Sequence, residues 1–237
     1  MNSRDKILNT VKNNQPPHRG LPSLPGDEAP SGAIRPASGS IQPLPASAEL
    51  IHQFIAILEA IGGSAYLVSG FDGIASILRE QFPKEQNLRI VSGCAELSGW
   101  PGIPAPGDDP HTLENIELAV LPAHFGVAEN GAVWITEDRM IHRALPFITQ
   151  HLALVIEGKN IVANMHEAYD RIAALESDVV NGKIFPAGGS GGYGFGTFIA
   201  GPSKTADIEQ SLVLGAHGPR SMTVFLLDET ISDAGFY

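Results

Sequence analysis

Short, continuous apolar runs separated by helical patterns are the feature that most constrains the fold of this chain of 237 residues. Each run is four to six residues long, which suits a strand that is apolar on both faces. The runs occupy residues 65–68, 88–92, 117–121, 131–136, 152–156, 196–200 and 223–227. Such strands belong to parallel sheets that are covered on both sides. The sequence therefore predicts an α/β fold with a mostly parallel sheet flanked by helices.

The segments between the runs carry apolar residues at helical spacing. Ser47 is a suitable N-cap for a first helix that ends at Gly62 and Gly63, and Asn164 is a suitable N-cap for a later one. Further helices are expected at residues 72–82 and 204–213. Because ligand sites in open α/β sheets lie beyond the carboxyl ends of the strands, we expect the functional residues at that edge.

The N-terminal 46 residues have a different composition. Residues 4–12 predict a short amphipathic helix, too short to be stable alone. Residues 15–46 contain eight prolines and four glycines, a density of breakers that excludes continuous regular structure. We therefore divide the chain into an N-terminal helix with an extended arm, residues 1–46, and one domain, residues 47–237. The arm can lie along its own domain or join copies of the chain in a homo-oligomer.

Charge and cysteine content exclude several classes of protein. The 15 basic and 26 acidic residues give a net charge of −11, which argues against nucleic acid as a partner. Cys94 is the only cysteine, so the chain cannot form an intrachain disulfide or supply the thiolates of an iron–sulfur cluster. The sequence contains no His-x-x-x-His pair, so we expect no metal site. Neither a signal-peptide core nor a membrane span is visible, and we expect a cytoplasmic protein.

The stretch 201–219, G-P-S-K-T-A-D-I-E-Q-S-L-V-L-G-A-H-G-P, is the richest in candidate functional residues. A predicted strand ends at its first residue, and a helix is expected to begin near Lys204 with Ser203 or Thr205 as N-cap. Backbone N–H groups at a helix N-terminus, together with a lysine, can bind phosphate or carboxylate. The candidate ligand-binding residues are Gly201, Ser203, Lys204, Thr205, Asp207 and Glu209. A well-capped helix without a ligand explains the same residues.

A glycine-rich segment at residues 188–196, G-G-S-G-G-Y-G-F-G, precedes this stretch. Its backbone can approach an anion closely or cover a ligand, which makes Gly192 and Gly194 candidate ligand-binding residues. It is not a P-loop, because no Gly-Lys-Ser/Thr follows. A surface loop without a ligand is the alternative.

Four side chains near the ends of strands are candidates for chemistry or for structure. Glu129 lies in the tripeptide E-N-G, which resembles the nucleophile motif of family I CoA-transferases but is also a tight-turn sequence. His217, in the turn H-G-P, is the candidate acid or base beside Lys204 and Ser203. For His124, in P-A-H-F-G, and for the Cys94 thiol, a structural role is favoured.

The block G-P-S-K-T-A-D-I-E, followed by L-G-A-H-G-P and M-T-V-F-L-L, resembles the C-terminal signature of the LUD domain. More narrowly, the chain is similar to the lactate-utilisation protein C family (LutC/YkgG). The resemblance implies a fold like that of the NagB/RpiA/CoA-transferase group. It also implies a role in oxidising L-lactate to pyruvate beside two partner proteins that carry the redox machinery. With Cys94 as the only cysteine, the iron–sulfur clusters are expected in those partners and no redox cofactor in this chain.

Two functions from different classes follow. The first is an accessory subunit of a lactate-oxidising complex that binds a small anion such as phosphate, a carboxylate or a CoA-like molecule. The second is a free-standing enzyme of the CoA-transferase or sugar-phosphate-isomerase kind, in which Glu129 or His217 acts on a small anionic substrate. The favoured hypothesis is the subunit.

Overall fold

The computed structural model describes residues 48–83, 89–97, 110–180, 194–205 and 213–228, and residues 4, 6, 7, 9 and 10 near the N-terminus. The chain divides into two units, Met1–Gln42 and Pro43–Tyr237. In the first unit the described residues are helical, as expected for residues 4–12, and the Thr10 hydroxyl donates a hydrogen bond of 2.9 Å to the Lys6 carbonyl. The proline-rich stretch 15–46 lies outside the described residues.

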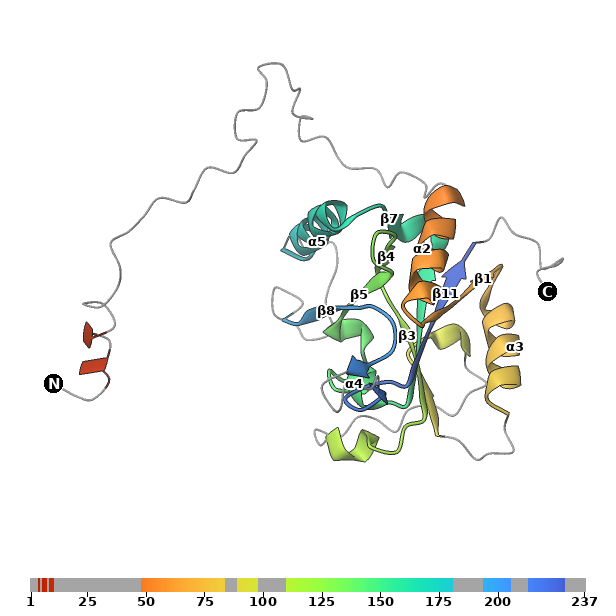
Figure 1. The fold of residues 1–237 in the computed structure, drawn as a ribbon, viewed down its shortest axis with the longest axis horizontal. Helices are drawn as coiled ribbons and strands as arrows, with labels where there is room; N and C mark the ends of the chain where they lie inside the picture. The colour runs from red at the N-terminus through yellow and green to blue at the C-terminus, as the bar shows by residue number, and fades with distance from the viewer. Residues whose placement is uncertain are drawn as a thin grey trace, which may run out of the picture. The chain divides into compact units, whose positions relative to one another are not determined.

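Five parallel strands form the main sheet of the second unit, in the order β1-β11-β6-β3-β2 (Figure 1). Their bounds are Ser64–Val68 for β1, Ile90–Ser92 for β2, Leu118–Pro122 for β3, His151–Glu157 for β6 and Ser221–Leu227 for β11. Every neighbouring pair in this sheet is parallel. Each strand coincides with one of the predicted apolar runs, and the predicted α/β fold is confirmed.

A helix covers each face of the main sheet, which explains why its strands are apolar throughout. Helix α3, Phe71–Gln81, packs on one face together with Leu118 and Val120 of β3. Helix α2, Ala48–Ala60, packs on the other face together with Ala119 and Leu121. Successive side chains of one strand point to opposite faces, so β3 is buried on both.

A second sheet, which the sequence analysis does not predict, has the strand order β7-β4-β5-β8. Its strands are Phe125–Val127 for β4, Ala132–Thr136 for β5, Ile161–Val162 for β7 and Gly196–Ile199 for β8. β5 pairs antiparallel with both β4 and β8, whereas β4 and β7 are parallel. The runs at 131–136 and 196–200 are therefore strands as predicted, but they belong to this sheet. β4 and β7 are too short to produce a sequence pattern.

The second sheet is buried between the main sheet and a further helix. On one side Val133 and Ile135 share a core with α2 and the main sheet. On the other side Phe125 and Val127 pack against Ala168 of helix α5, Met165–Val180. Figure 1 shows α3 and α5 on opposite sides of this layered unit.

The helix predicted at residues 204–213 is the main error of the sequence analysis. Lys204–Thr205 forms strand β9, which pairs antiparallel with β10, Val213–Leu214. Thr205 lies opposite Val213, and both are β-branched residues that favour strands. Residues 206–212 lie outside the described part of the chain.

The remaining described elements are short. Helix α4 is Leu145–Ile148, and the 3-10 helices are η2 Ala95–Leu97, η3 Pro110–Leu113, η4 Glu137–Arg139 and η5 Gly158–Asn160. Among the described residues, no helix has the length and apolar character needed to cross a bilayer.

Two predicted helix ends are confirmed by their hydrogen bonds. At the end of α2, the Gly63 N–H reaches the Leu58 carbonyl at 2.9 Å and the Gly62 N–H reaches the Glu59 carbonyl at 2.8 Å. These two bonds and the positive φ of Gly62 (85°) define a Schellman motif. At the start of α5, Asn164 accepts a hydrogen bond of 3.0 Å from the Glu167 N–H, as an N-cap does.

Candidate functional site

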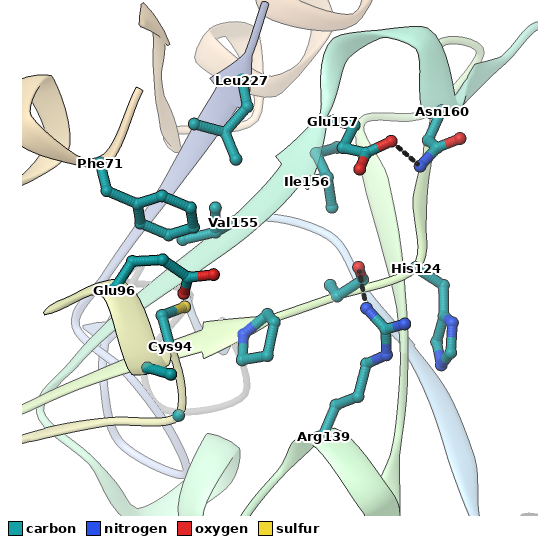
Figure 2. A pocket seen from close by; sticks show the side chains of 14 residues that line it. Phe71, Cys94, Glu96, His124, Arg139, Val155, Ile156, Glu157, Asn160 and Leu227 are labelled. Atoms are coloured by element: carbon teal, nitrogen blue, oxygen red, sulfur yellow. Dashed lines mark hydrogen bonds between the residues drawn. The ribbon is translucent and has the colours of Figure 1, made fainter. Parts of the chain in front are cut away.

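A pocket of about 480 Å³ lies beyond the carboxyl ends of the main-sheet strands (Figure 2). Gly93 follows β2, Pro122 ends β3, Glu157 ends β6 and Leu227 ends β11, and all four line the pocket. Phe71, the first residue of α3, follows the end of β1 in the chain and also lines the pocket at this edge. The pocket therefore occupies the edge where open α/β sheets bind ligands.

His124 is a buried polar residue of the pocket wall, with 8% of its surface exposed. Its Nε2 lies 2.6 Å from Thr136 Oγ1, and the Thr136 hydroxyl donates to Asp138 Oδ1 at 2.5 Å. Because the Thr136 proton is directed to Asp138, the hydrogen bond between His124 and Thr136 needs its proton on Nε2. The chain Asp138–Thr136–His124 thus fixes the imidazole in one tautomer.

The imidazole is also held neutral. Burial, and after it the positive charges of Arg139 and Arg171, lower the pKa of His124 from 6.5 to about 3. A third positive charge beside two guanidinium groups in a desolvated site is unfavourable. The His124 side chain in the pocket wall is therefore uncharged near pH 7.

Arg139 places a guanidinium group in the wall of the pocket. It is the last residue of η4, which directly follows β5, and its Nη1 donates a hydrogen bond of 2.9 Å to the Ala123 carbonyl. This bond ties the end of the second sheet to the segment after β3. A guanidinium has five N–H groups, so the single bond fixes its position and leaves it capacity to bind an anion.

A second arginine lies behind the pocket, on α5. Arg171 donates to Asn160 Oδ1 at 2.5 Å, and Asn160 in turn donates to Glu157 Oε2 at 3.3 Å. The guanidinium carbon lies 5.4 Å from the centre of the Phe125 ring, in a cation–π arrangement. Burial lowers the pKa of Arg171, while the Glu157 carboxylate acts in the opposite direction.

The opposite side of the pocket carries a thiol and a carboxylate (Figure 2). Cys94 is 6% exposed, and burial followed by the nearby Glu96 charge raises its pKa to about 12. The thiol is therefore protonated near neutral pH and is a poor nucleophile. This agrees with the structural role favoured from the sequence.

Glu129 lies in the turn between β4 and β5 and not among the residues that line the pocket. Its Oε2 accepts a hydrogen bond of 2.9 Å from the Met165 N–H at the start of α5. Asn130 Oδ1 accepts from the Ala132 N–H at 3.0 Å, and Gly131 has a φ of 68°. The tight-turn interpretation of Glu129-Asn130-Gly131 is therefore confirmed, and the Glu129 carboxylate caps a helix.

The helix start predicted near Lys204 is wrong, because Lys204 and Thr205 are in β9. The Lys204 ammonium donates instead to the Ile61 carbonyl at the end of α2. Gly201, with a φ of 72°, allows this approach, since a Cβ there would lie 3.1 Å from the same carbonyl oxygen. These residues connect two parts of the fold and do not line the pocket.

The structure does bring Ser203 and the turn of His217 together. The Ser203 N–H donates to the Pro219 carbonyl, and the Gly215 N–H donates to the Ser203 carbonyl, both at 2.9 Å. His217 itself is exposed. Two of the expected three partners thus share a loop contact, away from the lining of the described pocket.

The glycine-rich segment is described only from Gly194 onward. Gly194, with a φ of 58°, lies against the side chains of Glu137 and Arg143, which form an ion pair. Gly192, Asp207 and Glu209 lie outside the described residues. Within the described ranges, no three His, Cys, Asp or Glu side chains are grouped to hold a metal ion.

Sequence reasoning assigned His124 to structure and did not consider Arg139. A usable signal existed, because both lie within three residues of the end of a strand and ligand sites gather near such positions. What the sequence could not show is that β5 lies in a separate sheet whose end meets the main sheet here.

Comparison with known proteins places this arrangement in a family. The LUD domain family matches residues 109–227, half of the chain and the part that contains His124 and Arg139. A lactate utilization protein C from Bacillus pumilus (strain SAFR-032) is 32% identical over 124 residues, 49% of this chain and 47% of that protein. The protein of the same name from Geobacillus kaustophilus (strain HTA426) is 26% identical over 179 residues, 73% of this chain and 66% of that protein.

The chain therefore spans about half to two thirds of the length of these relatives. A crystal structure of a DUF162 family protein from Deinococcus radiodurans matches with a TM-score of 0.52 at 20% identity. The match covers 76% of this chain and 98% of that one, which shows a shared fold. On the family match over residues 109–227, this chain belongs to the LUD domain family.

Proposed function

We propose that this chain is the C-type subunit of an L-lactate utilisation system, in which L-lactate is oxidised to pyruvate together with two iron–sulfur partner proteins. The observation that carries the proposal is membership of the LUD domain family, with relatives named lactate utilization protein C. The subunit would act in the cytoplasm as part of a complex.

The single cysteine supports the division of labour. Oxidation of L-lactate to pyruvate releases two electrons and two protons, so an electron acceptor is required. An iron–sulfur cluster usually needs four thiolates. This chain offers only Cys94, whose pKa is raised to about 12. The electrons are therefore assigned to clusters in the partners, and this chain is proposed to carry no redox cofactor of its own.

Deletion of the gene tests the role in the cell. The deletion strain should lose growth on L-lactate and keep growth on pyruvate, and a plasmid copy should restore growth on lactate. In extracts, lactate-dependent dye reduction should require this chain and both partners together. Unchanged growth of the deletion strain on lactate would refute the proposal.

The purified chain separates this role from the free-standing enzyme. Under the subunit proposal, the chain alone transfers no CoA and isomerises no sugar phosphate. If it does either, Glu129→Gln and His217→Gln identify the acting residue by loss of turnover. The contact between the Glu129 carboxylate and the Met165 N–H favours a structural role for Glu129.

A further inference from the structure

The pocket is larger than L-lactate requires. Lactate has six non-hydrogen atoms, and even at the roughly 30 Å³ that a water molecule takes in the liquid these would fill roughly 180 Å³. The pocket measures about 480 Å³, within the range typical of sites for larger organic molecules. A ligand that fills it must carry a body beyond the lactate skeleton.

One end of the pocket is suited to an anion. Arg139 places its guanidinium group in the wall at this end, next to His124, whereas Arg171 on α5 is not part of the lining. A guanidinium group in a pocket wall is suited to pair with an anionic group of a ligand.

The balance of charge favours a single negative charge on the ligand. Two carboxylates, Glu96 and Glu157, line the pocket beside its one lining arginine, Arg139, so the lining carries no excess of positive charge. A phosphate monoester with two negative charges would meet more repulsion here than a carboxylate with one. A guanidinium also matches the planar carboxylate in a bidentate arrangement.

The other end is suited to an apolar body. Phe71, Val155 and Leu227 line it, next to the protonated thiol of Cys94. Figure 2 shows Phe71, Cys94 and Glu96 on the side of the pocket away from Arg139 and His124. A ligand that spans both ends therefore has a charged head and an apolar part.

We propose that this pocket binds an organic monocarboxylate larger than lactate, with Arg139 paired to its carboxylate and its apolar or aromatic body against Phe71, Val155 and Leu227. The proposal goes beyond the lactate role and does not rest on it. A chain that failed to support growth on lactate would still be expected to bind such an acid.

Calorimetric titration of the full chain tests the ligand class with three probes: 3-phenyllactate, L-lactate and phenyl phosphate. Burial of the phenyl ring should make 3-phenyllactate bind about ten- to hundredfold more tightly than L-lactate. Equal or tighter binding of L-lactate would overturn the size argument. Tighter binding of phenyl phosphate would overturn the assignment to a carboxylate, and no saturable binding of 3-phenyllactate would overturn the whole proposal.

Paired variants test the anchor. Arg139→Gln should weaken 3-phenyllactate binding by about tenfold or more, because a charge-assisted hydrogen bond is lost. Arg79→Gln makes the same change of charge on an exposed position in the last turn of α3 and should leave the dissociation constant unchanged. Equal affinities of the two variants would contradict the role of Arg139.

A second variant is expected to increase the affinity and leaves the hydrogen bond between Arg139 and Ala123 in place. Glu96 is exposed and its charge acts on Cys94 inside the pocket. Glu96→Gln should therefore tighten 3-phenyllactate binding on the order of two- to fivefold. Glu80→Gln, on the exposed surface of α3, is the matched control and should have no effect. An unchanged affinity in Glu96→Gln would count against a carboxylate in this pocket.

Discussion

His124 combines two constraints that rarely occur together at one histidine. It is bonded to Thr136, whose own proton goes to Asp138, and it lies within the field of Arg139 and Arg171. The hydrogen bond fixes the tautomer, and burial, followed by the two positive charges, lowers the pKa so that the ring stays neutral. The folded protein thus contains a neutral imidazole at pH values where an exposed histidine would be charged.

Stability should depend on pH through this residue. The pKa of His124 falls from 6.5 to about 3 on folding, so below pH 6.5 the unfolded chain binds a proton that the folded chain does not. The contribution of His124 to the free energy of unfolding is fully present above pH 6.5. It decreases as the pH falls from 6.5 towards 3, by up to about 1.4 kcal/mol per pH unit. Urea unfolding between pH 7 and 5 measures it, above the range in which most carboxylates titrate. His124→Gln should show a shallower loss than the wild type, and parallel curves would contradict the assignment.

Lys204 lies in a strand where the sequence predicted the start of a helix. Its ammonium does meet a helix terminus, but the carboxyl end of α2 and not the amino end of a helix of its own. Lys204→Met should lower the free energy of unfolding by roughly 0.5–1 kcal/mol, because a cation and a hydrogen bond at a helix C-terminus are lost. Thermal unfolding measures the change, with exposed Lys6→Met as the control. The affinity for 3-phenyllactate should not change in Lys204→Met. A loss of affinity would show that Lys204 takes part in ligand binding.

The candidate site was out of reach of sequence reasoning at the residue scale for a physical reason. His124 and Arg139 are 15 positions apart: His124 lies between β3 and β4, and Arg139 ends η4 after β5. Their association depends on where β5 lies in space, which no local pattern reports. By contrast, the Asn130-Gly131 turn and the helix end at Gly62-Gly63 depend on local backbone preference, and both were predictable.

The start of α5 is an element held by side chains from two places. Asn164 and Glu167 exchange hydrogen bonds across the first turn, and Glu167 also accepts from the Ala163 N–H at 2.9 Å. Glu129 adds a third carboxylate contact from the β4–β5 turn, at the Met165 N–H. The exposed N–H groups of the first helical turn are therefore satisfied largely by local side chains.

Removing the N-cap should destabilise this element. Asn164→Ala is expected to cost about 1–2 kcal/mol in the free energy of unfolding, because it removes the acceptor of the Glu167 N–H. Asn164→Asp retains an acceptor and a favourable charge at the helix N-terminus and should restore most of the loss. Chemical denaturation of the two variants measures both values. Equal destabilisation by Ala and Asp would show that the cap contributes little.

A continuous apolar run, more than strand length, decided which strands the sequence could predict, since β2 was found and β4, also of three residues, was not. The five main-sheet strands were found because burial on both faces produces continuous apolar runs. β4 and β7, with three and two residues, are too short for any periodicity. The segment from Lys204 was assigned to a helix because its apolar spacing allowed one, whereas pairing between β9 and β10 determines the structure.

At the scale of the whole unit, Phe54 of α2 connects the two sheets. It is fully buried in the core that contains residues of the main sheet and of the second sheet. A Cβ on Gly126 of β4 would lie 2.8 Å from the Phe54 ring, which shows how closely the two elements pack. The two sheets should therefore unfold together.

Phe54→Ala should cost about 3–5 kcal/mol, because it leaves a cavity between the sheets. Far-UV circular dichroism and the fluorescence of Trp134, measured in a Trp100→Phe background, should still give coincident transitions. Leu214→Ala, at a position that is 50% exposed, is the control and should cost less than about 1 kcal/mol. Separate transitions for the two probes would show that the sheets are independent.

The position of β11 determines when the main sheet can be completed during synthesis. β11 lies between β1 and β6, and β1 pairs in this sheet with β11 alone. A ribosome must therefore release residues 221–227 before β1, made much earlier, gains its neighbour. Pairing over such a sequence separation is slow, and open strand edges on a nascent chain promote aggregation. The emerging protein consequently depends on protection of β1 and β6 until its last main-sheet strand is inserted.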